Sequence, residues 1–132
     1  MTRIFVMTPE FDKCWKNIGL TDQELKELQE EILLNPQVGA VIQGTGGLRK
    51  MRYAIGNKGK SGSIRVLYVD LVVHEKVYLI TAYTKSQKDN LSNEEKAIVK
   101  KMIEQLKDEA DKMHNENASQ KKSDYLFESV TE

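Results

Sequence analysis

The stretch IRVLYVDLVVHEKVYLITAY, residues 64–83, contains the two strongest predicted strands of the chain. Residues 64–73 are rich in β-branched and aromatic side chains, which favour extended structure, and residues 77–83 share this composition. The polar tripeptide at 74–76 is typical of a tight hairpin turn between them. The stretch therefore predicts an antiparallel hairpin at the centre of the fold.

A third strand is predicted just before this hairpin, at residues 48–55. Glycines at 44, 46 and 47 mark a loop in front of it, and NKGKSGS at 57–63 is typical of an exposed turn behind it. Consecutive strands joined by short turns form an antiparallel meander. We therefore expect three neighbouring strands in one small sheet.

Helices are predicted on both sides of this meander. A short strand at 3–7 is followed by helices at 9–18 and 21–34, which we expect to form a hairpin with one apolar side. A last helix begins at an S-x-x-E capping box at 92–95. These elements predict an α+β fold: a small antiparallel sheet backed by an N-terminal helical hairpin, plus a C-terminal helix.

The apolar periodicity of the last helix fades beyond about Asp108. We therefore expect one domain at 1–108 and a polar C-terminal extension at 109–132 that is frayed or disordered. A single domain also fits the length of 132 residues.

Composition excludes several classes of protein. The longest apolar run is far shorter than the ~20 residues of a membrane-spanning helix, and the N-terminus does not resemble a secretory signal. One cysteine and two histidines exclude a disulfide framework and a cysteine-based zinc site. The sequence also lacks a nucleotide-binding glycine motif. We expect a cytoplasmic protein without cofactor, metal site or membrane partner.

The 20 basic and 20 acidic residues balance, but they are unevenly distributed. No acidic residue lies between Glu31 and Asp70. A one-sided positive field of this kind suits a polyanion, above all a nucleic acid, although a solvated basic loop would have the same composition. The basic residues of this interval and of the segment after it are Arg49, Lys50, Arg52, Lys58, Lys60, Arg65, Lys76, Lys85 and Lys88.

Side chains two residues apart in a strand share a face. Lys50 and Arg52 therefore point to one side of the sheet, and Met51 and Tyr53 point to the core on the other. Arg65 interrupts the apolar run of the next strand. Converging cations of this kind could hold a scissile phosphate, while RNA supplies its own 2′-hydroxyl nucleophile. From the residues alone, an RNA-binding surface is favoured over a nuclease.

Three segments carry a family resemblance: GTGGLRKMR at 44–52, GKSGSIRVLYV at 59–69 and YLITAYTKSQKDNLS at 78–92. With the order of elements over about residues 1–107, they resemble the HigB branch of the RelE/ParE toxin superfamily. The resemblance implies a metal-independent endonuclease that cleaves messenger RNA on the ribosome and contacts ribosomal RNA. It also implies neutralisation by a HigA-like helix-turn-helix antitoxin, with which the toxin binds operator DNA.

The resemblance also implies residue roles. Lys50 and Arg52 match basic positions that deprotonate the 2′-hydroxyl and steady the phosphate, and Arg65 matches the arginine that stabilises the transition state. Lys85 stands where such toxins carry an arginine. Leu91 falls near the position of a catalytic tyrosine, so the general acid would be a lysine or another tyrosine, Tyr83 or Tyr68. The residues expected to contact RNA are Arg49, Lys58, Lys60, Tyr83 and Lys88.

Two other functions fit the same resemblance. A ParE-like toxin would poison gyrase without catalytic cations, and its expression would damage DNA rather than cleave RNA. A non-catalytic member would act only as the operator-binding partner of an antitoxin, and its expression would not be toxic.

Overall fold

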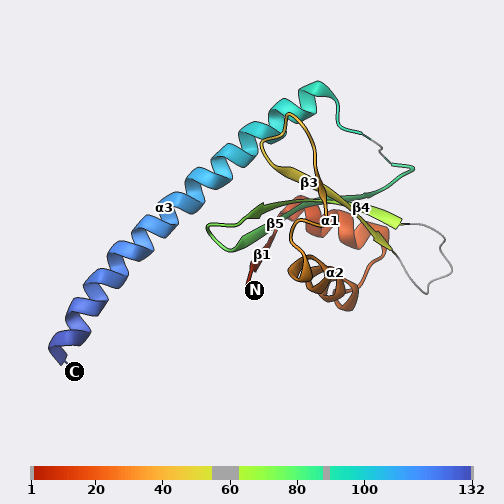
Figure 1. Ribbon diagram of the computed structural model, residues 1–132. Coiled ribbons are helices and arrows are strands. Elements are labelled where there is room, and N and C mark those ends of the chain that lie inside the picture. The colour runs from red at the N-terminus through yellow and green to blue at the C-terminus, as the bar shows by residue number, and fades with distance from the viewer. Residues whose placement is uncertain (1, 55–62, 88–89, 132) are drawn as a thin grey trace.

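The computed structural model describes the backbone of residues 2–54, 63–87 and 90–131, and side chains within these ranges up to Met113. It is a mixed α+β structure with a five-stranded sheet and three helices, as the sequence predicts for the fold class (Figure 1). The elements in chain order are β1 (Ile4–Met7), α1 (Pro9–Ile18), α2 (Asp22–Leu34), β2 (Ala40–Val41), β3 (Leu48–Ala54), β4 (Ser63–Leu71), β5 (Lys76–Thr84) and α3 (Asn93–Thr131).

The strand order in the sheet is β1-β5-β4-β3-β2. The predicted meander of β3, β4 and β5 is confirmed, because both of its pairings are antiparallel. The sheet also contains two features that the sequence did not indicate. β1 pairs with β5 in parallel, so the sheet is mixed rather than purely antiparallel, and the two-residue β2 extends the other edge. A parallel pairing needs a long connection, which no local sequence pattern marks.

The turn between β4 and β5 lies earlier than expected. β4 ends at Leu71, and the turn is closed by backbone hydrogen bonds from His74 N to the Leu71 carbonyl and from Glu75 N to the Val72 carbonyl, both 3.2 Å. Val72 and Val73 are therefore in the turn and exposed, and the prediction that the strand reaches residue 73 is wrong. Their β-branched side chains extend the strand pattern although the backbone has already turned.

Helix boundaries follow the predicted caps. The Thr8 hydroxyl accepts a hydrogen bond from Phe11 N at 3.1 Å and donates one to the Ile80 carbonyl at 2.8 Å, so it caps α1 and also fixes it to β5. Gly19 ends α1 in the left-handed conformation, with φ of 91°. Capping boxes at Thr21 and Ser92 begin α2 and α3 as predicted.

The two faces of the sheet build two separate apolar clusters. Figure 1 shows α1 and α2 on one side of the sheet and α3 on the other. Side chains of α1 and α2, including Phe11, Trp15 and Leu28, pack on one face together with Met51 and Tyr53, as the alternation in β3 predicts. α3 packs on the opposite face through its first half, which includes Ile103 and Ala110. α3 covers only part of that face, and this leaves room for a site.

A β-bulge in β5 preserves the assignment of side chains to these faces. The register steps from the pair Leu67–Thr81 to the pair Tyr68–Leu79, so Ile80 is the additional residue. Because of this additional residue, Leu79 and Ala82 both lie in the α1–α2 cluster, and Ile80 and Tyr83 both lie in the α3 cluster.

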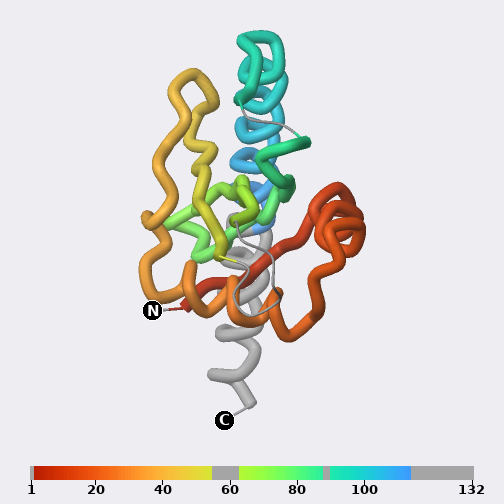
Figure 2. Tube along the Cα trace, turned by 90° about the vertical axis from the view of Figure 1, so that its right-hand side faces the viewer, coloured from red at the N-terminus to blue at the C-terminus, as the bar shows by residue number. Residues whose placement is uncertain are grey.

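The glycine turn at 44–47 lies beside the first turns of α3 (Figure 2). Gly44, Gly46 and Gly47 all have positive φ, and the Lys107 ammonium donates to the Gly46 carbonyl at 3.3 Å. Thr45 is fully buried and closes the turn, because its hydroxyl donates to the Ile42 carbonyl at 2.6 Å and accepts from Leu48 N at 3.1 Å. The loop predicted from these glycines is confirmed.

α3 continues to Thr131, although the apolar periodicity predicted that the helix fades at about Asp108. On the first half of α3, Asp111 Oδ1 lies 2.7 Å from His74 Nε2, and this contact links the helix to the β4–β5 turn. The division into a domain at 1–108 and an extension at 109–132 stays a prediction. Within the described residues, no helix has the length and apolar character needed to cross a membrane.

Candidate nucleic-acid interface

Three polar side chains form a row across β3, β4 and β5 near one end of these strands, on the face that α3 partly covers. Arg52 of β3 lies directly opposite Arg65 of β4, and Arg65 lies directly opposite Tyr83 of β5. Residues paired in this way project from the same face, with Cβ atoms about 5 Å apart. We call Arg52, Arg65 and Tyr83 the cationic row.

Arg65 is the most enclosed cation of this row. Only 8% of the residue is exposed, and its Nη1 donates to the Ser63 hydroxyl at 2.9 Å and to the Ser63 carbonyl at 3.3 Å. Ser63 lies two residues earlier in β4, on the same face, so the strand itself positions the guanidinium.

Neither arginine of the row has an acidic partner in the described parts of the chain. No carboxylate in residues 2–54, 63–87 and 90–113 lies within 4 Å of the Arg65 or the Arg52 guanidinium. A buried charge is costly unless it is paired, and like charges directly opposite each other in a sheet repel. The arrangement is therefore suited to an anion that enters from outside.

Two further predicted cations lie near this row. Lys50 is on the same face of β3 and lies opposite Leu67, one step along the strand from the Arg52–Arg65 pair. Lys85 is exposed and follows the end of β5, where Thr84 lies opposite Ile64 at the start of β4. The structure thus brings Lys50 next to the cationic row and places Lys85 at the same end of the sheet.

The remaining residues predicted to contact RNA do not join this group in the described structure. Arg49 lies on the opposite face, where its Nη1 donates to the Gly39 carbonyl at 2.7 Å and to the Gln37 carbonyl at 3.4 Å. Lys58, Lys60 and Lys88 lie outside the described residues. An RNA contact by any of these four residues stays a prediction.

The tyrosines differ in their access to the row. Burial raises the pKa of Tyr68, which is fully enclosed on the α1–α2 face and donates to the Pro36 carbonyl at 2.7 Å. Burial also raises the pKa of Tyr53 to about 12, and that side chain lies on the same face. Of the two tyrosines named as possible general acids, Tyr83 lies directly opposite Arg65 on the same face, whereas Tyr68 points to the other face.

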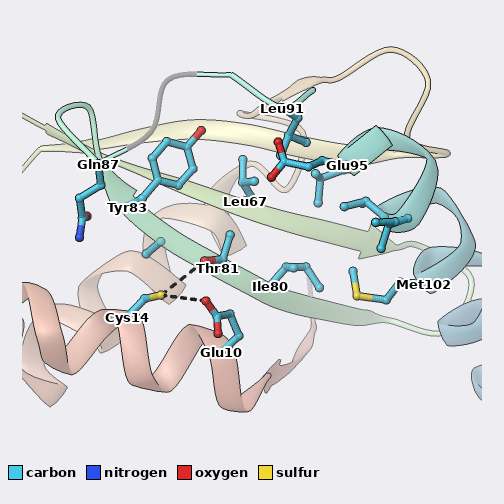
Figure 3. Close-up of a pocket in the computed structure, with 14 residues that line it drawn as sticks. Glu10, Cys14, Leu67, Ile80, Thr81, Tyr83, Gln87, Leu91, Glu95 and Met102 are labelled. Atoms are coloured by element: carbon cyan, nitrogen blue, oxygen red, sulfur yellow. Dashed lines mark hydrogen bonds between the residues drawn. The ribbon is translucent and has the colours of Figure 1, made fainter. Parts of the chain in front are cut away.

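A cavity of about 540 Å³ opens beside the cationic row (Figure 3). Its floor is β5 from Ile80 to Tyr83, with Leu67 of β4 beside it, and its other walls are α1 and the first turns of α3. Tyr83 belongs to both the cavity and the row. The four predicted catalytic cations do not line this cavity. The sequence suggested that they would converge on one concavity, whereas the structure places them beside the cavity.

Polar groups occur at the edge of this mostly apolar cavity. The Cys14 thiol is 3.4 Å from Glu10 Oε1, to which it donates, and 3.6 Å from the Thr81 hydroxyl (Figure 3). Gln87 lies at the Tyr83 end, where its Oε1 accepts from Thr84 N at 2.8 Å. The sequence did not predict this cavity, because its walls come from five separate parts of the chain and only the spacing of Glu10 and Cys14 on α1 is a local signal.

The fold and this face together define a class: a small α+β protein in which two arginines lie opposite each other on the sheet face that its last helix partly covers. The chain belongs to the RelE toxin family, because the family model described as the RelE toxin of the RelE/RelB toxin–antitoxin system matches residues 2–124. The match extends beyond residue 107, where the motif resemblance ends.

Two solved structures are similar to this chain. A mutant of the E. coli toxin RelE in the free state has 17% sequence identity and a TM-score of 0.49, and the match covers 67% of this chain and 90% of that chain. The toxin–antitoxin complex RelBE of E. coli, solved intact, gives a chain with 18% identity and a TM-score of 0.47, covering 63% of this chain and 96% of that chain.

Proposed function

We propose that this chain is a HigB-type toxin that cleaves messenger RNA on the ribosome and so inhibits translation. The observation that carries the proposal is the Arg52–Arg65 pair. Arg65 is almost fully enclosed, held by neutral groups of Ser63, and faces a second arginine. A phosphodiester between the two guanidinium groups would relieve their repulsion, and planar guanidinium groups match phosphate oxygens well.

In the proposed mechanism the 2′-hydroxyl of the RNA attacks the adjacent 3′-phosphate. The bond from phosphorus to the 5′-oxygen of the next nucleotide breaks, which leaves a 2′,3′-cyclic phosphate and a 5′-hydroxyl. Arg52 and Arg65 stabilise the charge that grows on the phosphate oxygens. Lys50 accepts the proton of the 2′-hydroxyl, and Lys85 or Tyr83 donates a proton to the leaving 5′-oxygen.

The proposed partners follow from the same function. Messenger RNA in the ribosome is the substrate, and ribosomal RNA is the surface that the remaining basic residues contact. A helix-turn-helix antitoxin of the HigA type neutralises the toxin, and the pair binds operator DNA. The family description names a toxin–antitoxin system, which supports an antitoxin as a partner.

The proposal is tested by expressing the wild-type chain and Arg65→Ala in bacterial cells and mapping new RNA 5′ ends. Lys26→Ala is the matched control, because Lys26 is exposed on α2, on the other side of the sheet. We expect growth arrest and in-frame RNA ends for the wild type and Lys26→Ala, and loss of both for Arg65→Ala.

Other results would favour the alternative functions. DNA damage without new RNA ends would show a ParE-like toxin that acts on gyrase. Normal growth with the wild-type chain would show a non-catalytic partner of an antitoxin. Equal toxicity of Arg65→Ala and the wild type would remove Arg65 from the mechanism.

A further inference from the structure

The cavity beside the cationic row is continuous with it through two neighbouring side chains. Tyr83 lines the cavity and lies directly opposite Arg65, and Leu67 lines the cavity and lies directly opposite Lys50. Arg65 and Lys50 are therefore each separated from a cavity-lining residue by only one cross-strand pair. Any ligand group attached to an anion at Arg65 begins next to the cavity.

The spacing of strands sets how far such a group must extend. Neighbouring strands are about 4.8 Å apart, so the Tyr83 side chain stands one strand from Arg65 and the outer wall at α1 lies beyond it. In a nucleotide the base is joined to the phosphate by one sugar. A phosphate held by Arg52 and Arg65 therefore allows its own base to lie over Tyr83 and enter the cavity.

The walls of the cavity suit a flat aromatic group. Its volume of about 540 Å³ lies within the ~300–1,000 Å³ of small-ligand pockets. Most of the lining is apolar, with the Tyr83 ring at one end and Leu91 and Met102 on the side of α3 (Figure 3). Proteins that bind unpaired RNA bases combine aromatic or apolar faces with polar groups at the base edge.

The polar edge of the cavity contains more acceptors than donors. Glu10 and Glu95 contribute carboxylates; Glu10 Oε1 accepts from the Cys14 thiol and Glu95 Oε1 accepts from Ser92 N. The Gln87 amide oxygen accepts hydrogen bonds from Thr84, so its amide nitrogen is the group that can donate to a ligand. Carboxylates accept hydrogen bonds from the amino groups of bases.

We propose that this cavity binds a nucleobase of the RNA whose phosphate the cationic row holds, and that it favours a base with an exocyclic amino group over uracil. The inference rests on the proposed function, because it takes the anion at Arg65 to be an RNA phosphate. It adds a site of base selection to a protein whose cations contact only the RNA backbone.

An apolar protein segment is the competing occupant of the same cavity. The carboxylates at the edge of the cavity favour a ligand with amino groups. The arginines one strand away favour a ligand that also carries a phosphate. A nucleotide has both, and a protein segment would need acidic and basic groups in the same short span.

The test measures binding of three probes to the purified full-length chain: adenosine 3′-monophosphate, uridine 3′-monophosphate and ribose 5-phosphate. We expect adenosine 3′-monophosphate to bind about tenfold or more tightly than ribose 5-phosphate, because stacking on an aromatic side chain contributes that much. Uridine 3′-monophosphate should bind with intermediate affinity. Equal affinity for all three probes would overturn the proposal.

Ile98→Asp tests the position of the base. Ile98 lines the cavity and is 68% exposed, so a charged side chain is tolerated there but adds a polar, negative group to the cavity wall. We expect the advantage of adenosine 3′-monophosphate over ribose 5-phosphate to disappear. Val73→Asp is the matched control, since Val73 is exposed in the β4–β5 turn away from the cavity, and it should keep the advantage.

The two proposals fail in different ways. If Ile98→Asp keeps the full base preference but loses neutralisation by an antitoxin, the cavity binds a protein segment and the base site is wrong. RNA cleavage by the wild type that depends on Arg65 would still support the nuclease. If the wild type neither cleaves RNA nor binds any of the three probes, both proposals are wrong.

Discussion

Arg65 shows how one side chain can be both fixed and available. It lies within a strand, which sets its direction, and two groups of Ser63 bind one of its nitrogens. No carboxylate in the described ranges neutralises it, in contrast to Arg3, whose Nε is 2.8 Å from Asp70 Oδ1 and whose pKa is raised by that hydrogen bond. The comparison separates a structural arginine from one that is suited to an external anion.

Ser63→Ala is predicted to weaken catalysis without unfolding the protein. The substitution removes the 2.9 Å hydrogen bond that orients the Arg65 guanidinium. We expect RNA cleavage to fall by roughly 3- to 10-fold, the value of one hydrogen bond, and the free energy of unfolding to change by less than about 0.5 kcal/mol. Ser63→Thr keeps the hydroxyl and should restore cleavage. An unchanged rate for Ser63→Ala would show that Arg65 needs no such support.

Tyr68→Phe is predicted to destabilise the fold. The Tyr68 hydroxyl accepts from Gly39 N at 2.9 Å and donates to the Pro36 carbonyl at 2.7 Å, inside a fully buried environment. Removing it leaves both backbone groups without a partner, at a cost of about 1–3 kcal/mol in unfolding free energy. Urea denaturation measures this value.

Tyr78→Phe is the control for this measurement, because the Tyr78 hydroxyl makes no hydrogen bond with any described residue. It should change the unfolding free energy by less than about 0.5 kcal/mol. Equal effects of the two substitutions would contradict the role of Tyr68 in fixing the segment before β2.

Local sequence signals predict most of the boundaries of the strands and helices of this chain, but they do not predict which elements pack or pair together. The caps at Thr8, Thr21 and Ser92 and the glycine turn at 44–47 each depend on a few adjacent residues, so the sequence predicts them. The parallel pairing of β1 with β5 depends on residues more than 70 positions apart, as between Ile4 and Lys76. Such contacts are set by the packing of the whole sheet and leave no local pattern.

The contact between β3 and α2 predicts a pH dependence of stability. Burial, with Glu27 and the neighbouring Glu24 and Glu31, raises the pKa of Tyr53 to about 12, against about 10 in an unfolded chain. The folded state therefore keeps the phenol protonated while the unfolded state loses the proton. This contribution to stability is fully present below pH 10 and is lost as the pH rises towards 12.

The measurement compares the unfolding free energy of the wild type and Tyr53→Phe between pH 9 and pH 12. Since phenylalanine does not titrate, the difference between the two proteins isolates Tyr53 from the lysines that titrate in the same range. We expect the wild type to lose more stability than Tyr53→Phe over this interval. Parallel curves for the two proteins would contradict the shifted pKa.

The site as a whole could be predicted only in part. Alternation in β3 predicts that Lys50 and Arg52 share a face, and the apolar neighbours of Arg65 indicate its face in β4. The register that sets Arg52 directly opposite Arg65 depends on the connection between the strands, and the cavity depends on where α1 and α3 pack. Sequence patterns predict the direction of side chains within an element but not the distances between elements.

Helices lie on both sides of one sheet, and the two faces of the sheet differ in composition. The α1–α2 face contains the larger apolar cluster, and the opposite face contains the cationic row beside the cluster that α3 covers. The central proposal is that the cationic row holds an RNA phosphate during cleavage.

The most direct test is cleavage of messenger RNA by the purified protein on programmed ribosomes, under single-turnover conditions, with the chemical end of the 5′ product determined. We predict a 2′,3′-cyclic phosphate and a rate that falls by about 100-fold or more in Arg65→Ala, as on removal of one oxyanion donor, but not in Lys26→Ala. Cleavage at an undiminished rate by Arg65→Ala, or no cleavage by the wild type, would contradict the account.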